Sequence, residues 1–110
     1  NLSGAEGEWL NLQQSDLTEA NLSEAYLAYA ILSNATVENT ILQGTSLAAA
    51  NLQQANLRHA NLQQANLNKA DLWQADLSGA NLTGASMEQT SINSSKTYGT
   101  VMTDGTVLEG

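Results

Sequence analysis

The sequence predicts a solenoid, in which the chain winds into stacked coils around a narrow interior. Two observations lead to this fold class. First, all seventeen positions at steps of five from Leu12 to Ile92 are aliphatic, and fourteen of them are leucine. Second, the residue two positions before each of them is small, with Ala in twelve cases and Ser or Thr in four, and Leu10 is the one large exception. A chain that turns the same way every five residues would point both positions inward.

A five-residue period fits neither an α-helix nor a flat strand. On a helix, successive leucines would rotate by about 140° and cover every face, and on a strand an odd period would send them to alternating sides. Each five-residue word is therefore predicted to form one side of a coil. Burying one leucine gives roughly 2 to 3 kcal/mol, whereas ordering five residues costs about 7 kcal/mol. Stability is consequently expected to be collective, because a single word cannot fold alone.

The repeated word resembles that of the pentapeptide-repeat family, as in Ala50-Asn51-Leu52-Gln53-Gln54 and Ala75-Asp76-Leu77-Ser78-Gly79. Asn or Asp precedes the leucine in ten of the seventeen words. The resemblance implies an all-β fold, a right-handed quadrilateral β-helix of about four to five coils with about 20 residues in each. It also implies a bacterial origin, and within bacteria it favours cyanobacteria.

Outside the regular words, both ends of the chain are expected to cap the solenoid. Residues 1–10 are interpreted as an N-terminal cap with irregular first words, in which Gly7 replaces the inward leucine and Trp9 and Leu10 supply bulk. The pentapeptide-repeat β-helix is then expected to span residues 11–92.

Residues 93–110 are interpreted as a C-terminal cap or hairpin. Asp104 and Gly105 lie between β-forming residues, a pair that favours a type I′ turn. We expect this hairpin to pack over the last coil.

The charge of the chain argues against polyanionic partners. Eleven acidic residues face three basic ones, giving a net charge of −8, and residues 1–57 contain six acids and no base. We therefore expect no nucleic-acid partner and no membrane contact, and no apolar run reaches transmembrane length. A soluble protein is expected, either cytoplasmic or, if a signal peptide was removed ahead of Asn1, located in the periplasm or thylakoid lumen.

No constellation of catalytic or ligand-binding residues is present in the sequence. Cysteine is absent, and no zinc, phosphate-loop, calcium-loop or nucleophile-elbow motif occurs. His59 is the one histidine and is expected to be a solvated residue beside Arg58, while Asp71 and Asp76 occupy the repeat position and are expected to be structural. We therefore predict no enzyme activity, no catalytic residue, no cofactor and no metal site.

Five consecutive words lack the Asn or Asp before the aliphatic residue, which alters the surface around more than one full coil. The substituting residues are Tyr26, Ile31, Thr36, Ile41 and Ser46. The least polar outward patch, a possible interaction patch, is predicted to comprise Tyr26, Ala28, Tyr29, Ile31, Ala48 and Ala49. Clustered exposed apolar groups can mark an interface, although tolerated drift at outward positions would leave the same pattern.

Two functions from different classes fit these observations. The first is a non-enzymatic structural scaffold that binds an unidentified protein partner. The second, implied by the resemblance, is a DNA mimic that modulates DNA gyrase. Four coils would form a rod of roughly 20 Å, over which duplex DNA carries about 12 charges, yet residues 12–92 contain seven acids and two bases. We favour the scaffold, as a monomer or an end-to-end dimer.

Overall fold

The fold is a β-helix built from single bridged residues rather than from long strands. The computed structural model describes residues 1–109. Every fifth residue from Glu6 to Val101 forms a β-bridge, and the parallel pairs join residues twenty positions apart, from Glu6↔Tyr26 to Asn81↔Val101. Four words therefore make one coil, which is the register that the resemblance implies. Residues 1–109 contain no helix, hence none that could cross a membrane, and no strand longer than one bridged residue.

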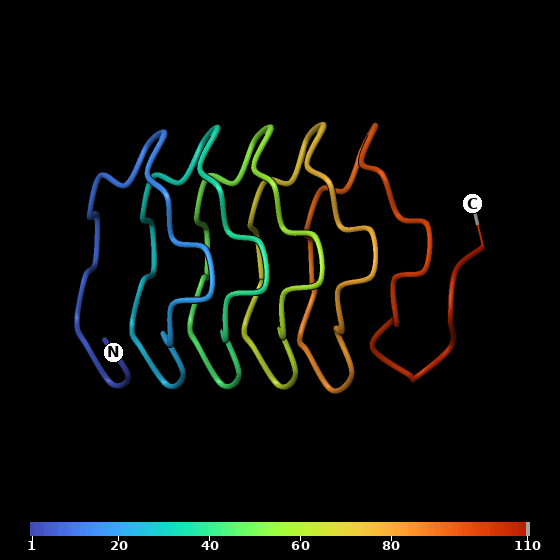
Figure 1. Ribbon diagram of the computed structural model, residues 1–110, viewed down its shortest axis with the longest axis horizontal. Coiled ribbons are helices and arrows are strands. Elements are labelled where there is room, and N and C mark those ends of the chain that lie inside the picture. Colours follow the sequence, from blue (N-terminus) through green and yellow to red (C-terminus); the bar gives the residue numbers. More distant parts are fainter. Residues whose placement is uncertain (110) are drawn as a thin grey trace.

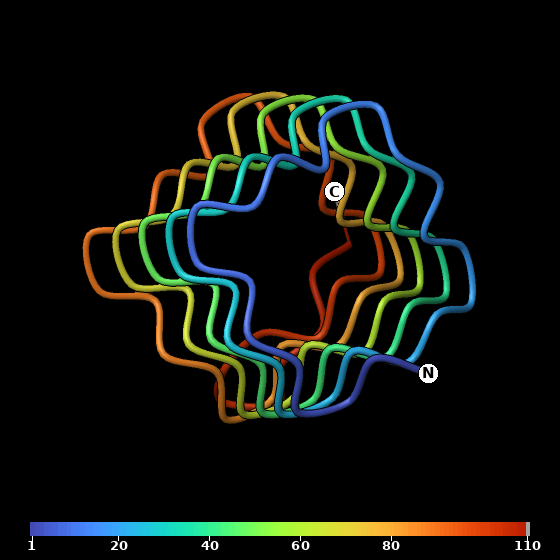
Figure 2. The ribbon, with the colours of Figure 1, turned by 90° about the vertical axis from the view of Figure 1, so that its left-hand side faces the viewer.

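The coils stack along one axis into a short rod. Figure 1 shows this stack from the side, with the two chain ends at opposite ends of the rod. Figure 2 looks along the axis from the N-terminal end, where each coil has a four-cornered outline and the chain runs clockwise as it recedes, which is a right-handed path. The molecule measures 34 × 26 × 22 Å along its principal axes. Residues twenty apart thus form columns along the rod.

Each corner of a coil is a tight turn closed by the word's own backbone. In the central word, the N–H of Ala55 donates to the C=O of Leu52 at 3.1 Å. Gln54, the third residue of this turn, has φ of 60°. A positive φ occurs at every such position from Gly4 to Gly99, although most of them hold residues other than glycine. This pattern of φ angles is typical of type II turns, and it costs a non-glycine residue about 1 to 2 kcal/mol.

The interior is filled by the aliphatic and small residues of every word. The side chains from Leu22 to Leu82 in this register are at most 3% exposed. Where threonine replaces the inward alanine, its hydroxyl donates to a leucine carbonyl of the preceding coil, as Thr45 Oγ1 does to Leu22 O at 2.7 Å. Every buried side-chain polar atom in residues 1–109 has a hydrogen-bond partner. The narrow core therefore accepts threonine without an unpaired hydroxyl.

The Asn or Asp of each word also has a structural role. Its Oδ1 accepts the backbone N–H two residues later, as in Gln53 N to Asn51 Oδ1 at 3.0 Å. Asp71 and Asp76 accept the N–H groups of Trp73 and Ser78 in the same way, each at 3.0 Å. This side-chain turn satisfies a donor that faces outward at the corner.

The coil pairing extends beyond residues 11–92 at the N-terminal end. The N–H of Leu2 donates to the C=O of Asn21 at 2.8 Å, and that of Gly7 to Tyr26 at 2.7 Å. Glycine fits the leucine position of this word because the side chains of Leu10 and Leu27 occupy the space that a side chain at residue 7 would need. Backbone pairing between coils requires no consensus side chain, so the irregular words also form part of the rod. The rod is therefore 34 Å long, compared with the roughly 20 Å expected from the regular words alone.

At the other end the chain folds back on itself in a hairpin. Val101 forms an antiparallel bridge with Val107, and the N–H of Met102 donates to the C=O of Thr106 at 2.7 Å. The expected type I′ turn is wrong, since among the described hairpin residues only Gly105 has a positive φ, of 87°. The Asp104 carboxylate instead accepts the N–H of Thr106 at 3.0 Å, which holds a three-residue loop that ends in a left-handed glycine.

Candidate interaction surface

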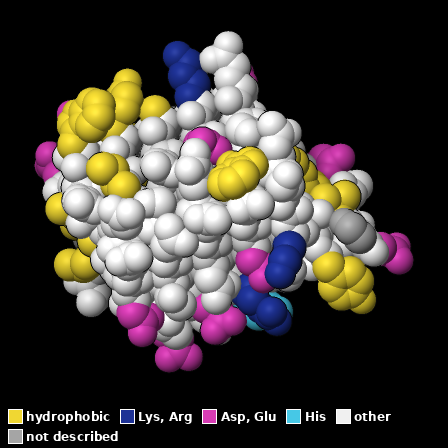
Figure 3. Space-filling view, turned by 90° about the horizontal axis from the view of Figure 1, so that it is seen from above, with side chains coloured by type: hydrophobic (Ala, Val, Ile, Leu, Met, Phe, Trp, Pro, Cys, Tyr) yellow, Lys and Arg dark blue, Asp and Glu magenta, His cyan; other side chains and the backbone are white. Residues whose placement is uncertain are grey.

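One side of the rod carries an exposed aromatic cluster near its N-terminal end. Trp9 and Tyr29 lie twenty positions apart in the same column, and their rings stack with centroids 4.4 Å apart and an interplanar angle of 14°. Trp9 is 64% exposed, Tyr29 45% and Tyr26 44%. Stacked aromatic rings present a large, rigid apolar surface at a low cost in conformational entropy. In Figure 3 hydrophobic side chains gather over this N-terminal end, at the left of the view.

The structure places the six residues of the predicted patch at different depths. Tyr26 and Tyr29 are exposed, and Ile31, Ala48 and Ala49 are half-buried. Ala28 is buried, with only 2% of its surface exposed, so it cannot serve as a contact residue. We use the term aromatic patch below for Trp9, Tyr26, Tyr29, Ile31, Ala48 and Ala49.

The repeat pattern places Trp9 in the N-terminal cap and outside the predicted patch. Gly7 occupies the leucine position of the word that contains Trp9, so the five-residue repeat is not recognisable at this point of the sequence. The signal was nevertheless present, because position 9 precedes Tyr29 by one full coil of twenty residues.

A carboxylate controls the ionisation of one patch residue. The Tyr26 hydroxyl donates a hydrogen bond to Glu8, and this bond, with the negative charge of Glu8, raises the pKa of Tyr26 above its ordinary value of 10.0. The phenol is therefore a neutral donor across the physiological pH range. The patch thus combines ring surface with a neutral phenol that donates to Glu8.

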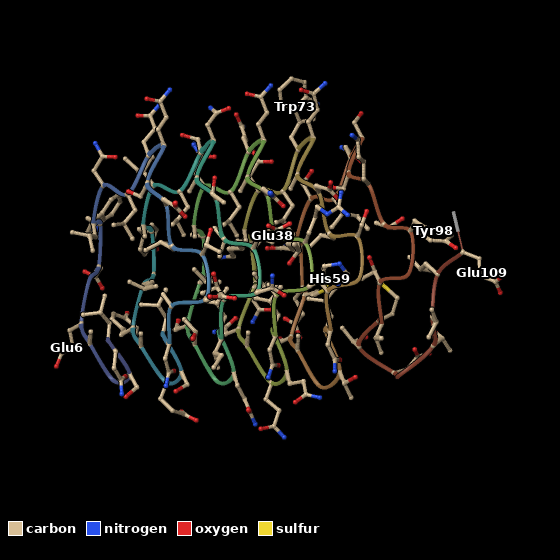
Figure 4. The ribbon with its side chains drawn as sticks, in the orientation of Figure 1. Glu6, Glu38, His59, Trp73, Tyr98 and Glu109 are labelled. Carbon is tan, nitrogen blue, oxygen red and sulfur yellow. The ribbon has the colours of Figure 1, made fainter. Side chains whose placement is uncertain are left out.

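The side that carries His59 has mixed charge. Arg58 Nε lies 3.7 Å from Glu38 Oε2, and Figure 4 shows Glu38 and His59 on the same side of the rod. Burial of Asp76 opposes its ionisation, but hydrogen bonds from Ser78 and the charges of Arg58 and Lys96 outweigh burial and lower its pKa. Within residues 1–109 no three His, Asp or Glu side chains converge on a common point that could hold a metal ion. The described surface also contains no pocket.

The repeated word and the twenty-residue coil together correspond to a known family. The family described as pentapeptide repeats matches residues 8–44 and 45–84, with eight copies of the repeat. The chain is a pentapeptide-repeat protein. No curated protein sequence matches it.

Three solved structures of other proteins are similar to this chain, and the first two of them share its fold. Rfr23, a pentapeptide-repeat protein from the cyanobacterium Cyanothece 51142, is 33% identical with a TM-score of 0.83, covering 93% of this chain and 87% of its own. QnrB1, a plasmid-mediated fluoroquinolone resistance protein, is 13% identical with a TM-score of 0.54, covering 91% of this chain and 66% of its own. A pentapeptide-repeat protein of the Arabidopsis thaliana thylakoid lumen is 30% identical with a TM-score of 0.43, covering 98% of this chain and 68% of its own.

Proposed function

We propose that this pentapeptide-repeat chain is a non-catalytic scaffold that binds a protein partner through the aromatic patch. The observation that carries the proposal is the Trp9–Tyr29 stack, with the exposed Tyr26 beside it. Other exposed large hydrophobic residues, such as Ile41 and Trp73, belong to other columns of the rod. Aromatic side chains with a polar group are the residue types most often found at the centre of protein interfaces.

The geometry of the rod also supports a binding role over a catalytic one. An enzyme needs polar groups that converge in a concave site. The outward side chains here diverge from a convex surface, and the Asp16, Asp71 and Asp76 carboxylates accept hydrogen bonds from backbone N–H groups.

Mimicry of DNA toward gyrase is less well supported. At one charge per 1.7 Å, duplex DNA carries about 20 charges over the length of this rod, whereas the chain has a net charge of −8. The likeness to QnrB1, at 13% identity, concerns the fold alone. A supercoiling assay tests this alternative directly, and we expect gyrase to be unaffected by an excess of the protein.

The experiment that tests the scaffold proposal compares partner capture by two triple variants. The patch variant carries Tyr26→Asn, Tyr29→Asn and Ile31→Asn. Two of these substitutions restore the Asn of the repeated word, and the third places Asn at a φ of 63°, where it is well tolerated. The patch variant should therefore fold at least as stably as the unmodified chain.

The matched control removes exposed apolar groups elsewhere, with Ile41→Asn, Trp73→Gln and Tyr98→Gln. Each protein is used to capture partners from a cyanobacterial lysate, and captured proteins are identified by mass spectrometry. We expect the unmodified chain and the control to retain the same partner and the patch variant to lose it. Retention by the patch variant, or equal loss in both variants, would show that the patch is not the binding surface.

A further inference from the structure

The hydrophobic residues at the turns of the rod are gathered in one column. Wherever a non-glycine residue of 1–109 occupies the left-handed corner position, it is polar except at Trp9, Tyr29 and Ala49, whose φ angles are 63°, 63° and 57°. These three follow one another at intervals of twenty residues, in consecutive coils. Asparagine tolerates a positive φ better than alanine or an aromatic residue does, so the turn conformation does not favour them. We call Trp9, Tyr29, Ala49 and the next residue of the same column, Lys69, the corner column.

Lys69 places a free positive charge at the end of this hydrophobic run. Its side chain is exposed and forms no ion pair within residues 1–109. Of the other two bases, Arg58 lies with its Nε 3.7 Å from Glu38 Oε2. The charge of Lys96 acts on Asp76, whose pKa it helps to lower. Figure 3 shows one basic side chain at the upper margin, next to the hydrophobic groups, and the other basic side chains near the lower margin. An acidic group of a partner can therefore pair with Lys69.

The spacing of the corner column decides which secondary structure fits along it. Neighbouring coils are about 4.8 Å apart, so Tyr29 and Lys69, two coils apart, are separated by about 10 Å along the axis. In an α-helix, residues i and i+7 lie on the same face about 10.5 Å apart, with i+3 and i+4 between them. In an extended segment about three residues cover this distance, and residues i and i+3 project to opposite sides. A helix parallel to the rod axis therefore matches the column.

Acidic residues on the same side of the rod set the direction of such a helix. Glu8 precedes Trp9 in the first coil, and Glu88 lies one coil beyond Lys69. The N-terminus of a helix carries a partial positive charge and its C-terminus a partial negative charge. The favoured direction places the helix N-terminus near Glu8, and an acidic side chain of the helix meets Lys69 before the chain reaches Glu88.

We propose that the partner element recognised by the aromatic patch is an amphipathic α-helix that lies along the rod, with apolar side chains on Trp9, Tyr29 and Ala49 and a carboxylate against Lys69. This inference rests on the proposed function and specifies the chemistry of the partner. A second copy of the chain is not this occupant, because residues 1–109 contain no helix.

The test uses a synthetic peptide of about 15 residues that is held helical by a side-chain crosslink. It carries Leu at positions i−4, i and i+3 and Glu at i+7. Binding to the whole chain is followed by NMR titration. We expect the Trp9 indole and Ala49 methyl signals to shift, while the Trp73 indole, which belongs to another column, stays unchanged. An uncrosslinked peptide with a central Pro, which prevents the helix, should bind at least roughly tenfold more weakly.

A charge exchange tests the pairing with Lys69. Lys69→Glu should weaken binding of the Glu peptide by about fivefold, and a peptide with Lys in place of Glu should recover that loss on the same variant. Lys96→Glu is the matched control, because it makes the same change in charge in another column and should leave binding of the Glu peptide unchanged.

The outcomes separate this proposal from the proposed function. Absence of peptide binding, equal binding of the proline peptide, or equal effects of the two lysine variants would each overturn the helix with its acid. Failure of the scaffold proposal is a different result, namely retention of the captured lysate partner by the patch variant. Loss of that partner by the patch variant, together with full retention by Lys69→Glu, would keep the aromatic patch as a binding surface and exclude the acidic contact.

Discussion

At the scale of single residues, the left-handed corner position combines local strain with contacts between coils. Gln54, His59 and Lys69 all adopt φ near 60°, a conformation that glycine adopts without penalty. Glycine occupies this corner position in only some of the words. The residues that lie next to these glycines, in the neighbouring coil, differ from one glycine to another. The imidazole of His59 lies against Gly79, where a methyl group would overlap it, whereas the space around Gly99 is open enough for one.

These two glycines allow strain and overlap to be separated. Gly99→Ala should lower the free energy of unfolding by about 1 kcal/mol, because it adds only the strain of a positive φ. Gly79→Ala should lower it further, since the methyl group displaces the His59 ring. Adding His59→Ala should return the cost of Gly79→Ala to that of Gly99→Ala. Urea unfolding of the parent chain, the three single variants (Gly99→Ala, Gly79→Ala and His59→Ala) and the double variant measures these differences. Equal costs of the two glycine substitutions with His59 present would contradict the contact.

The hydrogen bond from Tyr26 to Glu8 can be tested by titration. Glu8 raises the pKa of Tyr26 through this bond and its charge, so Glu8→Gln should lower that pKa toward 10.0. Ultraviolet absorbance of phenolate during an alkaline titration reports the change, and Tyr26→Phe identifies which of the three tyrosines is responsible. Because the folded pKa is raised, the stabilisation by this pair is complete below the unfolded pKa and disappears as pH rises through the folded value. An identical titration curve for Glu8→Gln would exclude the pairing.

At the scale of the coil, a leucine in the middle of the stack contributes more to the free energy of unfolding than a leucine at the same position of the first coil. Leu52 is fully buried, whereas Leu12, in the same column, is half-buried in the first coil. Leu52→Ala should lower the free energy of unfolding by about 3 kcal/mol, because the cavity cannot collapse between two coils. Leu12→Ala should lower it by about 1 kcal/mol, since less surface is lost from the interior. Chemical denaturation of both variants provides the measurement, and similar losses would indicate that the first coil is covered in solution.

The side-chain turns of the words predict a loss of stability in acid. Hydrogen bonds from Thr18 lower the pKa of Asp16, and those from Thr106 lower the pKa of Asp104. A depressed folded pKa stabilises the protein above the unfolded value of about 3.9 and loses this effect as pH falls through the folded value. Melting temperatures measured between neutral pH and strong acid should therefore fall below about pH 4. Asp16→Asn with Asp104→Asn keeps the Oδ1 acceptors without the titration, so the fall should be shallower.

At the scale of the whole molecule, the sequence predicts the winding of the chain better than its ends and its surface. The five-residue period identifies the inward positions because only a coil can bury them all. The end segments were harder to assign, since their backbone pairs without the consensus residues, as Gly7 does with Tyr26. The turn at Asp104 was predicted wrongly because its carboxylate bonds to Thr106 locally, which dipeptide preference does not describe.

The candidate site was predictable only for residues that lie in words with a recognisable five-residue register. Tyr26 and Tyr29 depart from the consensus in clear register, and they are exposed. Ala28 is buried, and the participation of Trp9 depends on stacking of its ring on Tyr29 across one coil. The twenty-residue register gives the column in which Trp9 lies, but it does not give the stacking of the Trp9 ring or the exposed fraction of Ala28.

The twenty-residue register also determines which changes in length the molecule can absorb. Insertion of four words adds one complete turn, so every column continues unbroken and the surfaces on both sides of the insertion stay aligned. Insertion of a single word preserves the interior equally well but rotates everything beyond it by a quarter turn around the axis. Two chains with equally sound cores can therefore present unrelated surfaces, and the number of words separating two surface features decides whether they lie on the same side of the rod.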